Sequence, residues 1–428
     1  MRFMFLLLLV SIHAVAQDST KLSLLFIGDI MQHDTQIAAA FDPATGEYNY
    51  DECFRQVKPI FDSADLTIGN LELSLGGPPY KGYPNFSAPD ELVETLVASG
   101  VDVLVTANNH CLDRGKKGLQ RTIAVLDTMH IPHTGTFVDS AQRANTYPLL
   151  IEEKSFRISL LNYTYGTNGI PVSKPNIVNY IDTTLIAADI IKAKEQHPDF
   201  IVAFFHWGDE YQRLPNKSQE DLARFCFTRG VKLVIGAHPH VLQPMEWRKD
   251  ADQLVVYSLG NFVSGQSSRY RNGGGMLHVE LQKNDSTTTI ANAEYELQYV
   301  YRDPARKYHI VPVTHFENDT TLIHEAAARA SIRQFASDSR KLLMEHNVNV
   351  GERPLADSVY FIVIEPPLAG ADTASVFKFY GIEPGSHDGR EVTTVGRFYD
   401  KEIAMQALSE IQTQFPELKA ILARTRRR

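Results

Sequence analysis

Residues Leu233-Val234-Ile235-Gly236-Ala237-His238-Pro239-His240 form a short β-rich apolar run that ends in a glycine turn and a histidine pair. Gly236 permits a tight turn directly after the run. The two histidines stand two positions apart, so in an extended segment their side chains point to the same side. Pro239 stiffens the segment between them. The stretch predicts a strand end that carries two imidazoles for one or two metal ions; the alternative is that Pro239 marks an ordinary turn.

Similar short apolar runs recur between residue 22 and about residue 300 and alternate with longer helical patterns, which predicts a layered α/β domain. The other runs are Ser23–Ile27, Leu66–Ile68, Val101–Val105, Ile158–Leu161, Ile201–Phe205 and Leu254–Tyr257. After Met276, stricter alternation predicts antiparallel strands that close the domain. Most of the runs are followed at once by polar residues, and open α/β sheets place their sites beyond the carboxyl ends of strands.

Seven of these strand-end residues are of the types that bind metals: Asp29, Asn70, Glu72, Asn109, His206, His238 and His240. Divalent cations bind carboxylate oxygens, amide oxygens and neutral imidazoles, and a pair of ions needs roughly six to eight such groups. One strand-end histidine alone is usually a hydrogen-bonded structural residue. Ligand-type residues at several separate strand ends are hard to explain by packing. We therefore expect one or two divalent metal ions, of Mn, Zn, Fe or Mg.

His110 directly follows Asn109 and is the candidate catalytic residue. An imidazole that titrates near neutrality suits a group that protonates a leaving group. The alternative role for His110 is a hydrogen bond that orients the Asn109 loop.

Taken in chain order, the polar blocks resemble those of the CapA family of poly-γ-glutamate capsule-associated proteins, over roughly residues 22–300. The blocks are Gly28-Asp29, Gly69-Asn70-Leu71-Glu72, Asn108-Asn109-His110 with Asp113 and Gly115, His206-Trp207-Gly208, Gly236-Ala237-His238-Pro239-His240 with Gln243-Pro244, and Tyr257-Ser258-Leu259-Gly260-Asn261-Phe262. CapA proteins are similar in turn to calcineurin-like metallophosphoesterases. The resemblance implies a four-layer α/β/β/α sandwich.

The phosphoesterase blocks read Asp-x-His, Gly-Asp, Gly-Asn-His, a lone His and Gly-His-x-His. The resemblance implies that Asp29 matches the first block's acid, that Glu72 or Asn70 takes the bridging position, and that Asn109 is the amide ligand. It implies the catalytic imidazole at His110 and the last ligands at His206, His238 and His240. Two departures are present: Met31 replaces the first block's histidine, and Asn70 stands where the bridging Asp is expected. The departures imply one firmly held metal and one labile metal.

Two further residues, Trp207 and Asn261, are the candidate substrate-binding residues. Trp207 belongs to a group of aromatic residues near strand-end loops, with Tyr163, Tyr165 and Tyr211, which either form a wall for a polymer or pack the sheet. The resemblance implies a metal-dependent protein of capsular polymer biosynthesis or processing, acting on an anionic polymer or a phosphoester. A non-catalytic envelope scaffold and a general phosphatase or nucleotidase are the alternatives.

Residues 1–16 predict a secretory signal peptide: Arg2 is the only charge, Phe5–Val10 is apolar, and Ala14-Val15-Ala16 offers a small-x-small cleavage site. A buried N-terminal strand or helix is the alternative. No later stretch approaches the ~20 apolar residues of a membrane span, so we expect a mature protein without a transmembrane segment, in the periplasm or at the cell surface. The net charge of −9 argues against a nucleic-acid partner.

The expected domains are the α/β domain at 17–318, a helical connector at 319–354 and a small α+β module at 355–428. The connector contains a helix at 324–347. The module shows strands at 359–364, 376–380 and 420–423 and a helix from 400 to about 415, and it resembles a SPOR-like module, a family that binds peptidoglycan glycan strands. A stretch at 366–374 replaces the usual first helix of that family, and the alternative is a small cap that stabilises the α/β domain. Cys53, Cys111 and Cys226 describe no disulfide framework and leave room for one pair.

We expect that export removes residues 1–16, because the apolar run is too short to anchor the chain and Ala14-x-Ala16 suits cleavage. N-terminal sequencing of the exported protein should begin at Gln17, and an Ala16→Arg variant should keep its leader. Exported material that begins at Met1 contradicts this expectation.

Overall fold

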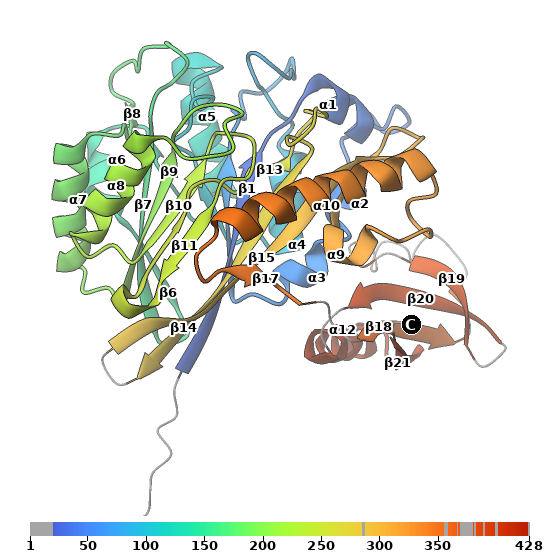
Figure 1. The fold of residues 1–428 in the computed structure, drawn as a ribbon. Helices are drawn as coiled ribbons and strands as arrows, with labels where there is room; N and C mark the ends of the chain where they lie inside the picture. The colour runs from blue at the N-terminus through green and yellow to red at the C-terminus, as the bar shows by residue number, and fades with distance from the viewer. Residues whose placement is uncertain are drawn as a thin grey trace, which may run out of the picture.

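The computed structural model describes residues 20–284, 287–354, 358–365, 367–368, 380, 382–387, 390–398 and 401–426. The expected signal peptide and residues 376–379 of the expected strand at 376–380 lie outside the described residues. Figure 1 shows a large body of two sheets with helices, and a smaller body formed by β18 to β21 and α12.

The first sheet has nine strands and is centred on β1 (Thr20–Ile30). Its main order is β16-β15-β14-β1-β2-β3-β4, with β13 beside β1 and β17 beside β15. The bounds are Leu66–Leu71 for β2, Val103–Val105 for β3, His133–Thr134 for β4, Asn261–Val263 for β13, Gly273–Asn284 for β14, Thr287–Arg302 for β15, Tyr308–Pro312 for β16 and Gly351–Glu352 for β17. β1 to β4 pair in parallel, while β14 to β16 are antiparallel, which confirms the antiparallel closure predicted after Met276.

The second sheet has six strands in the order β11-β12-β10-β9-β7-β6. The bounds are Met245–Arg248 for β11, Gln253–Val256 for β12, Leu233–Ala237 for β10, Phe200–His206 for β9, Phe156–Thr164 for β7 and Leu149–Glu153 for β6. A two-stranded pair, β5 (Thr136–Phe137) and β8 (Ile177–Val178), lies apart from both sheets. All seven apolar runs of the sequence contribute to strands, and four of them lie in the parallel core of this sheet.

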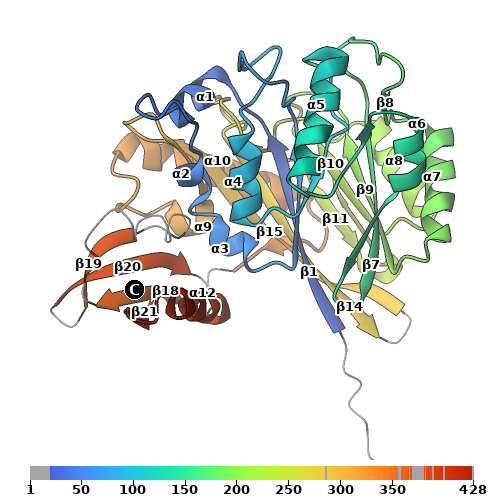
Figure 2. The same ribbon diagram turned by 180° about the vertical axis from the view of Figure 1, so that it is seen from behind.

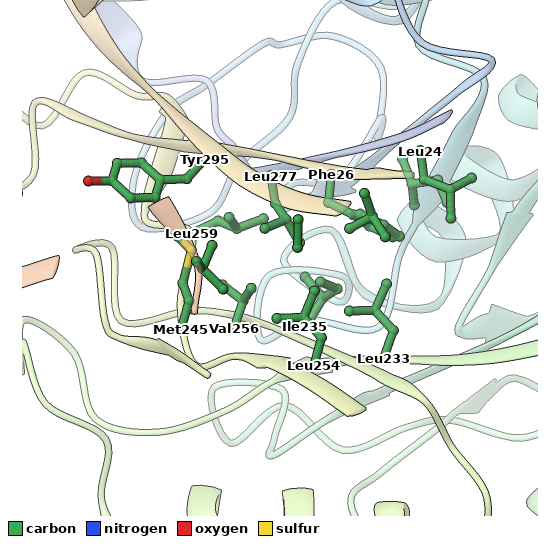
Figure 3. Packing of buried hydrophobic residues seen from close by; sticks show 14 of the residues in the cluster. Leu24, Phe26, Leu233, Ile235, Met245, Leu254, Val256, Leu259, Leu277 and Tyr295 are labelled. Atoms are coloured by element: carbon green, nitrogen blue, oxygen red, sulfur yellow. The ribbon is translucent and has the colours of Figure 1, made fainter. Parts of the chain in front are cut away.

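The two sheets share one apolar core, which Figure 3 shows from close by. Leu24 and Phe26 of β1 face this core, opposite Leu233 and Ile235 of β10. Successive strand residues point to opposite faces, so the intervening Leu25 and Ile27 of β1 join a second cluster on the outer face. A strand that is buried on both faces reads as a continuous apolar run.

Helices cover the outer face of each sheet, so the layers follow the predicted order α/β/β/α (Figure 2). The first sheet is covered by α1 (Asp34–Ala40), α2 (Asp51–Phe54), α3 (Lys58–Phe61), α4 (Glu91–Ser99) and part of α5 (Gly115–Thr128). The second is covered by α7 (Thr183–Glu195) and α8 (Lys217–Phe227), with α6 (Ser140–Thr146) beside β5. Local sequence sets the starts of two of these helices: Asp182 caps α7, and Asn216 and Gln219 form a capping box on α8.

The expected connector helix is α10 (Ala326–His346), and it packs on the large body rather than standing free. Ile332, Phe335 and Leu343 belong to the core between the sheets, and the Phe335 ring lies 5.7 Å from that of Tyr299 on β15. A short helix, α9 (Val313–Phe316), precedes it. The three cysteines are buried and free.

In its described residues the C-terminal module is a four-stranded sheet against which helix α12 packs, as expected for a small α+β unit. The order is β19-β20-β18-β21, with bounds Ile382–His387, Arg390–Phe398, Ser358–Glu365 and Lys419–Arg426. Ala404, Ala407 and Ile411 of α12 (Lys401–Gln414) pack on this sheet against Ile362 and Ile364. Within the described part of the chain, we find no helix with the length and apolar character of a membrane span.

We expect Ile235→Ala to lower the free energy of unfolding by about 2–5 kcal/mol, because Ile235 is fully buried between the sheets and the substitution leaves a cavity. Ile191→Ala on the outer side of α7 is the matched control: Ile191 is 61% exposed, so the cost should stay within about 0.5 kcal/mol. Urea unfolding followed by circular dichroism measures both. Equal costs for the two variants would show that the core between the sheets is wrongly assigned.

Candidate metal centre

The strand-end residues gather at one edge of the two sheets. Asp29 lies on β1 beside Asn70 on β2, where the two residues are partners in the ladder. In the second sheet, His206 ends β9 beside Ala237 of β10, and His238 follows directly. Parallel strands end at the same edge of a sheet, and the two sheets are packed face to face, so ligands from both sheets meet there.

Two overlapping groups of three side chains have the spacing of metal ligands. One group is Glu72, His238 and His240, and the other is Asp29, Glu72 and His206; in each, the ligand atoms lie within 4.8 Å of one another. All of these side chains are buried. Glu72 is the member common to both groups. Of the two residues that the sequence left open for the bridging position, Glu72 is the one whose side chain belongs to both groups, and the bridging role itself stays a prediction.

Asp29 is held by contacts from both sheets. Its Oδ2 lies 3.2 Å from His240 Nδ1, its Oδ1 accepts a hydrogen bond of 2.8 Å from Asn70 Nδ2, and the backbone N–H of His238 donates to Oδ2 at 3.2 Å. Burial alone would raise the pKa of Asp29, but the contacts with His240 and Asn70 outweigh burial and hold this pKa below its ordinary value. Asp29 is therefore a carboxylate, the form that binds a cation.

Glu72 is fully buried, and neither of its carboxylate oxygens has a hydrogen-bond partner. Its Oε1 lies 3.4 Å from His206 Nε2 and 3.7 Å from His240 Nε2. Burial and the nearby charge of Asp29 raise the pKa of Glu72 well above its ordinary value. A buried carboxylate without donors is costly unless a positive charge compensates it. The donor set therefore fits a divalent cation.

Two imidazoles of the centre, His206 and His238, are held in the form that binds metals. Burial, with the neighbouring imidazoles, lowers the pKa of His238 to about 3 and lowers the pKa of His206 well below its ordinary value. Neutral imidazole is the ligand form. His238 Nδ1 is buried without a hydrogen-bond partner, so this nitrogen, like the oxygens of Glu72, has its lone pair unsatisfied.

The two amides among the predicted ligands differ in what they present. Asn109 Oδ1 lies 2.8 Å from His206 Nε2, so its oxygen faces the centre. Asn70 instead turns its Nδ2 toward Asp29 and toward His206 Nδ1, at 2.8 and 3.2 Å. In this arrangement Asn70 positions two neighbours rather than offering an oxygen. Met31, which replaces the expected first-block histidine, packs in the outer apolar cluster.

His110 is oriented by an acid that the sequence analysis did not single out. Its Nδ1 lies 2.7 Å from Asp113 Oδ2, which also accepts the backbone N–H of Phe86 at 2.8 Å. The Phe86 ring packs against the imidazole at 4.7 Å between centroids. An Asp bonded to Nδ1–H fixes the tautomer whose Nε2 is available. The spacing of three residues between His110 and Asp113, within one turn, is a signal from which this pair could have been found.

Two more residues beside the centre were missed because their motifs carry no ligand signature. Asn168 Oδ1 accepts from Asn109 Nδ2 at 3.2 Å, so this loop residue supports a predicted ligand. His33 Nδ1 accepts the Gly265 backbone N–H at 3.1 Å, and its ring lies 5.3 Å from that of Phe86. Burial lowers the pKa of His33 to about 4. Only the folded chain brings these residues to the site.

The two candidate substrate-binding residues lie in different surroundings. Asn261 is fully buried, and its Oδ1 lies 3.0 Å from His240 Nδ1, so it contacts a predicted ligand. Trp207 packs in the core under α7 and α8, and its Nε1–H donates to the Tyr257 carbonyl at 2.9 Å. The indole also borders a groove that Tyr165 and Leu222 line. A substrate-binding role for Trp207 and for Asn261 stays a prediction.

Exposed tyrosines from three loops surround the imidazoles. The Tyr165 ring lies 4.5 Å from that of His238, Tyr211 lies 6.1 Å from His240, and Tyr83 lies 6.4 Å from His110. Their exposed fractions are 48%, 43% and 65%. Tyr163, by contrast, is buried and donates to Asp189. Of the expected aromatic wall, Tyr165 and Tyr211 flank the site.

Fold and site together define a four-layer α/β protein with a buried cluster of carboxylates and imidazoles at the carboxyl edge of its two sheets. The chain belongs to the family described as bacterial capsule synthesis protein PGA_cap, whose model matches residues 23–266. That range contains every predicted ligand.

Curated relatives agree with the family. The chain is 28% identical over 281 residues to the capsule biosynthesis protein CapA of Bacillus anthracis, covering 63% of this chain and 66% of that protein. It is 29% identical over 276 residues to the PGA biosynthesis protein CapA of Bacillus subtilis (strain 168), covering 61% and 68%. The matches thus span about two thirds of the length of each relative.

Among solved structures, the calcineurin-like phosphoesterase YfkN of Bacillus subtilis is similar to this protein, with a TM-score of 0.41 and 15% sequence identity. The match covers 76% of this chain and 98% of that chain. A 5'-nucleotidase from Candida albicans SC5314 is also similar, with a TM-score of 0.39 and 11% sequence identity. That match covers 74% of this chain and 58% of the nucleotidase chain. Likeness at this level says nothing about the reaction.

We expect Glu72→Gln to leave the metal-free protein about as stable as the wild type, because the raised pKa of Glu72 favours the protonated carboxyl when no ion is bound, and the Gln amide has nearly the same shape and is also neutral. Added Mn²⁺ or Zn²⁺ should raise the melting temperature of the wild type and not that of the variant, since an ion that binds only the folded state stabilises it. Glu220→Gln, on the exposed side of α8, is the control and should respond like the wild type. A variant that keeps the full metal response would remove Glu72 from the ligand set.

Proposed function

We propose that this protein is an exported, divalent-metal-dependent hydrolase that acts on an anionic capsular polymer, or on a phosphoester, during polymer biosynthesis or processing. The observation that carries the proposal is the unsatisfied carboxylate of Glu72, which lies between two sets of imidazoles in a buried cluster. The PGA_cap family supports the capsular context. The periplasm or the cell surface is the proposed location.

Asp29, Glu72, Asn109, His206, His238 and His240 would hold the ion or ions, with Asn70 supporting Asp29. A bound divalent ion lowers the pKa of a water molecule and polarises a phosphoryl or acyl oxygen. With Met31 in place of the first-block histidine, we propose one firm and one labile position. Mn, Zn, Fe and Mg all accept a mixed set of oxygen and imidazole ligands.

His110 is the proposed proton donor to the leaving group. Asp113 keeps the proton on Nδ1, and the ring is held from the side by Phe86, so the imidazole has one fixed orientation. Asn261 and Asp29 both contact His240 Nδ1, which fixes the orientation of that ring and leaves its Nε2 toward Glu72. These contacts support two proposed tasks for the chain's own residues: holding ligands in place and moving one proton.

A second candidate is a non-catalytic scaffold that holds polymer at the wall. The observation that favours it is the separate C-terminal module, whose resemblance to SPOR-like modules makes peptidoglycan its proposed partner. A general phosphatase or nucleotidase would use the same centre on small phosphoesters. Metal content and turnover of a chromogenic phosphodiester separate these candidates: metal without turnover of the diester leaves the polymer as substrate, and absence of metal favours the scaffold.

We expect His238→Ala to lower the metal content of the purified protein more than His110→Ala does. His240 cannot replace the lost metal bond from its own position, whereas loss of a proton donor leaves the ligands in place. His110→Ala should instead lower turnover by roughly 10²–10⁴. Elemental analysis and hydrolysis of bis(p-nitrophenyl) phosphate measure the two effects.

His346→Ala, at an exposed position near the end of α10, is the control and should change neither quantity. If His110→Ala loses metal in parallel with His238→Ala, the proton-donor role is wrong and His110 is a ligand or a structural residue.

A further inference from the structure

A basic loop between β13 and β14 is tied to the candidate centre by one buried side chain. Asn261 Nδ2 donates to the backbone carbonyl of Arg271 at 2.8 Å, while its Oδ1 lies 3.0 Å from His240 Nδ1. Asn261 is fully buried, so both contacts are shielded from water. The same amide that orients a predicted ligand therefore also fixes the backbone of Arg271.

Tyr211 links the Arg271 side chain to the same imidazole. The Arg271 guanidinium lies 4.4 Å from the centroid of the Tyr211 ring, and this ring lies 6.1 Å from that of His240. The backbone N–H of Tyr211 donates to the carbonyl of Pro239, between the two histidines, at 2.8 Å. Tyr211 holds a positive φ of 67°, which is uncommon for a bulky residue. The ring is thus fixed at the rim of the centre rather than free in solvent.

The neighbouring arginines contact Asp338, whereas Arg271 contacts the side chain of Tyr211. Arg269 makes a two-point ion pair with Asp338 on α10, with both distances 2.8 Å. Arg213 donates to the Asp338 carbonyl at 2.7 Å and lies over the Tyr270 ring. Across the described ranges, no ion pair of Arg271 with a carboxylate is found. Arg271 also shares a side-chain hydrogen bond with Tyr211, and the other N–H groups of the guanidinium match the oxygens of phosphate and carboxylate.

The negative charge around the centre makes the positive charge of Arg271 important for binding an anion. The chain carries a formal net charge of −9, and the buried wall of the site contains Asp29 and Glu72. An anionic ligand that approaches such a site is repelled unless a positive group meets it. Arg271 is a charged donor at the rim that its own surroundings do not neutralise.

We propose that Arg271 and Tyr211 form an anion-binding subsite beside His240, in which the guanidinium binds a phosphate or carboxylate group of the ligand and the ring holds the guanidinium in place. The inference rests on the proposed function, because it names the charge class of the ligand of that site. Phosphate and carboxylate share the recognition chemistry, so the experiment has one arm for each.

The test is titration calorimetry of the full, metal-loaded chain with two probes: inorganic phosphate, and an oligomer of γ-linked glutamate that contains only carboxylates. Arg271→Gln should weaken the binding of at least one probe about 10- to 100-fold, as expected for loss of a charge-assisted hydrogen bond. Arg271→Lys should recover part of the loss, because it keeps the charge without the two-pronged geometry. Arg224→Gln, an exposed arginine of α8, is the matched control and should bind as the wild type does.

Loss for phosphate alone identifies a phosphate subsite, and loss for the oligomer alone identifies a carboxylate subsite. Metal content, measured on the same samples, should be the same in Arg271→Gln and the wild type. Tyr211→Leu provides a second variant with an intact Arg271 and should weaken the same probe, by a smaller factor. Unchanged binding of both probes by Arg271→Gln, or no binding of either probe by the wild type, overturns the subsite.

The subsite and the proposed function fail in distinguishable ways. A wild type that binds a probe in an Arg271-dependent manner but turns over no substrate supports the subsite and contradicts the hydrolase. A wild type that hydrolyses the diester while Arg271→Gln keeps the same KM and the same affinity for both probes supports the hydrolase and contradicts the subsite.

Discussion

The face-to-face packing of the two sheets is the constraint on which the rest of the molecule depends. Stacked sheets lie about 10 Å apart, and the space between them is filled by apolar side chains such as Phe26 and Ile235. Polar ligands from the two sheets can therefore meet only where the strands end. Because β1 runs parallel to β2, and β9 runs parallel to β10, their carboxyl ends bring Asp29 and Asn70 on one side to His206 and His238 on the other. The site is a consequence of the sandwich.

The fold was largely predictable because its strands are buried on both faces and therefore read as uninterrupted apolar runs. The predicted ligands gathered for the same reason: each lies at the end of such a run or within about five residues of it. The sequence could not reveal where the loops between the strands place their side chains relative to the site. Asp113, Asn168, His33 and Arg271 lie in loops or helix starts whose position depends on the packing of the whole chain. Of these four residues, only Asp113 has a local sequence signal, because it lies three residues after His110.

Strand alternation explains why neighbouring residues of one motif have different surroundings. His206 ends β9 on the side of the candidate centre, so the next residue, Trp207, packs into the core under α7 and α8. Tyr165, one residue past the end of β7, lies over His206 and His238 instead. An aromatic residue beside a ligand in sequence is therefore a poor guide to the substrate side. Position in the sequence also did not separate Glu72 from Asn70: β1 has an irregular register between Ile27 and Asp29, and only the folded chain shows that Glu72 lies near the imidazoles of both groups while Asn70 donates to Asp29.

Charge balance at the centre links cation binding to the stability of the fold. With His206 and His238 neutral, Asp29 and Glu72 are two acids buried together, and no described donor reaches the oxygens of Glu72. Two such groups cannot both be charged in a dry interior without a compensating positive charge, which is either a proton on Glu72 or a divalent cation. A divalent cation bound there would supply that charge, and, because an ion that binds only the folded state stabilises it, would stabilise the site edge of both sheets as well.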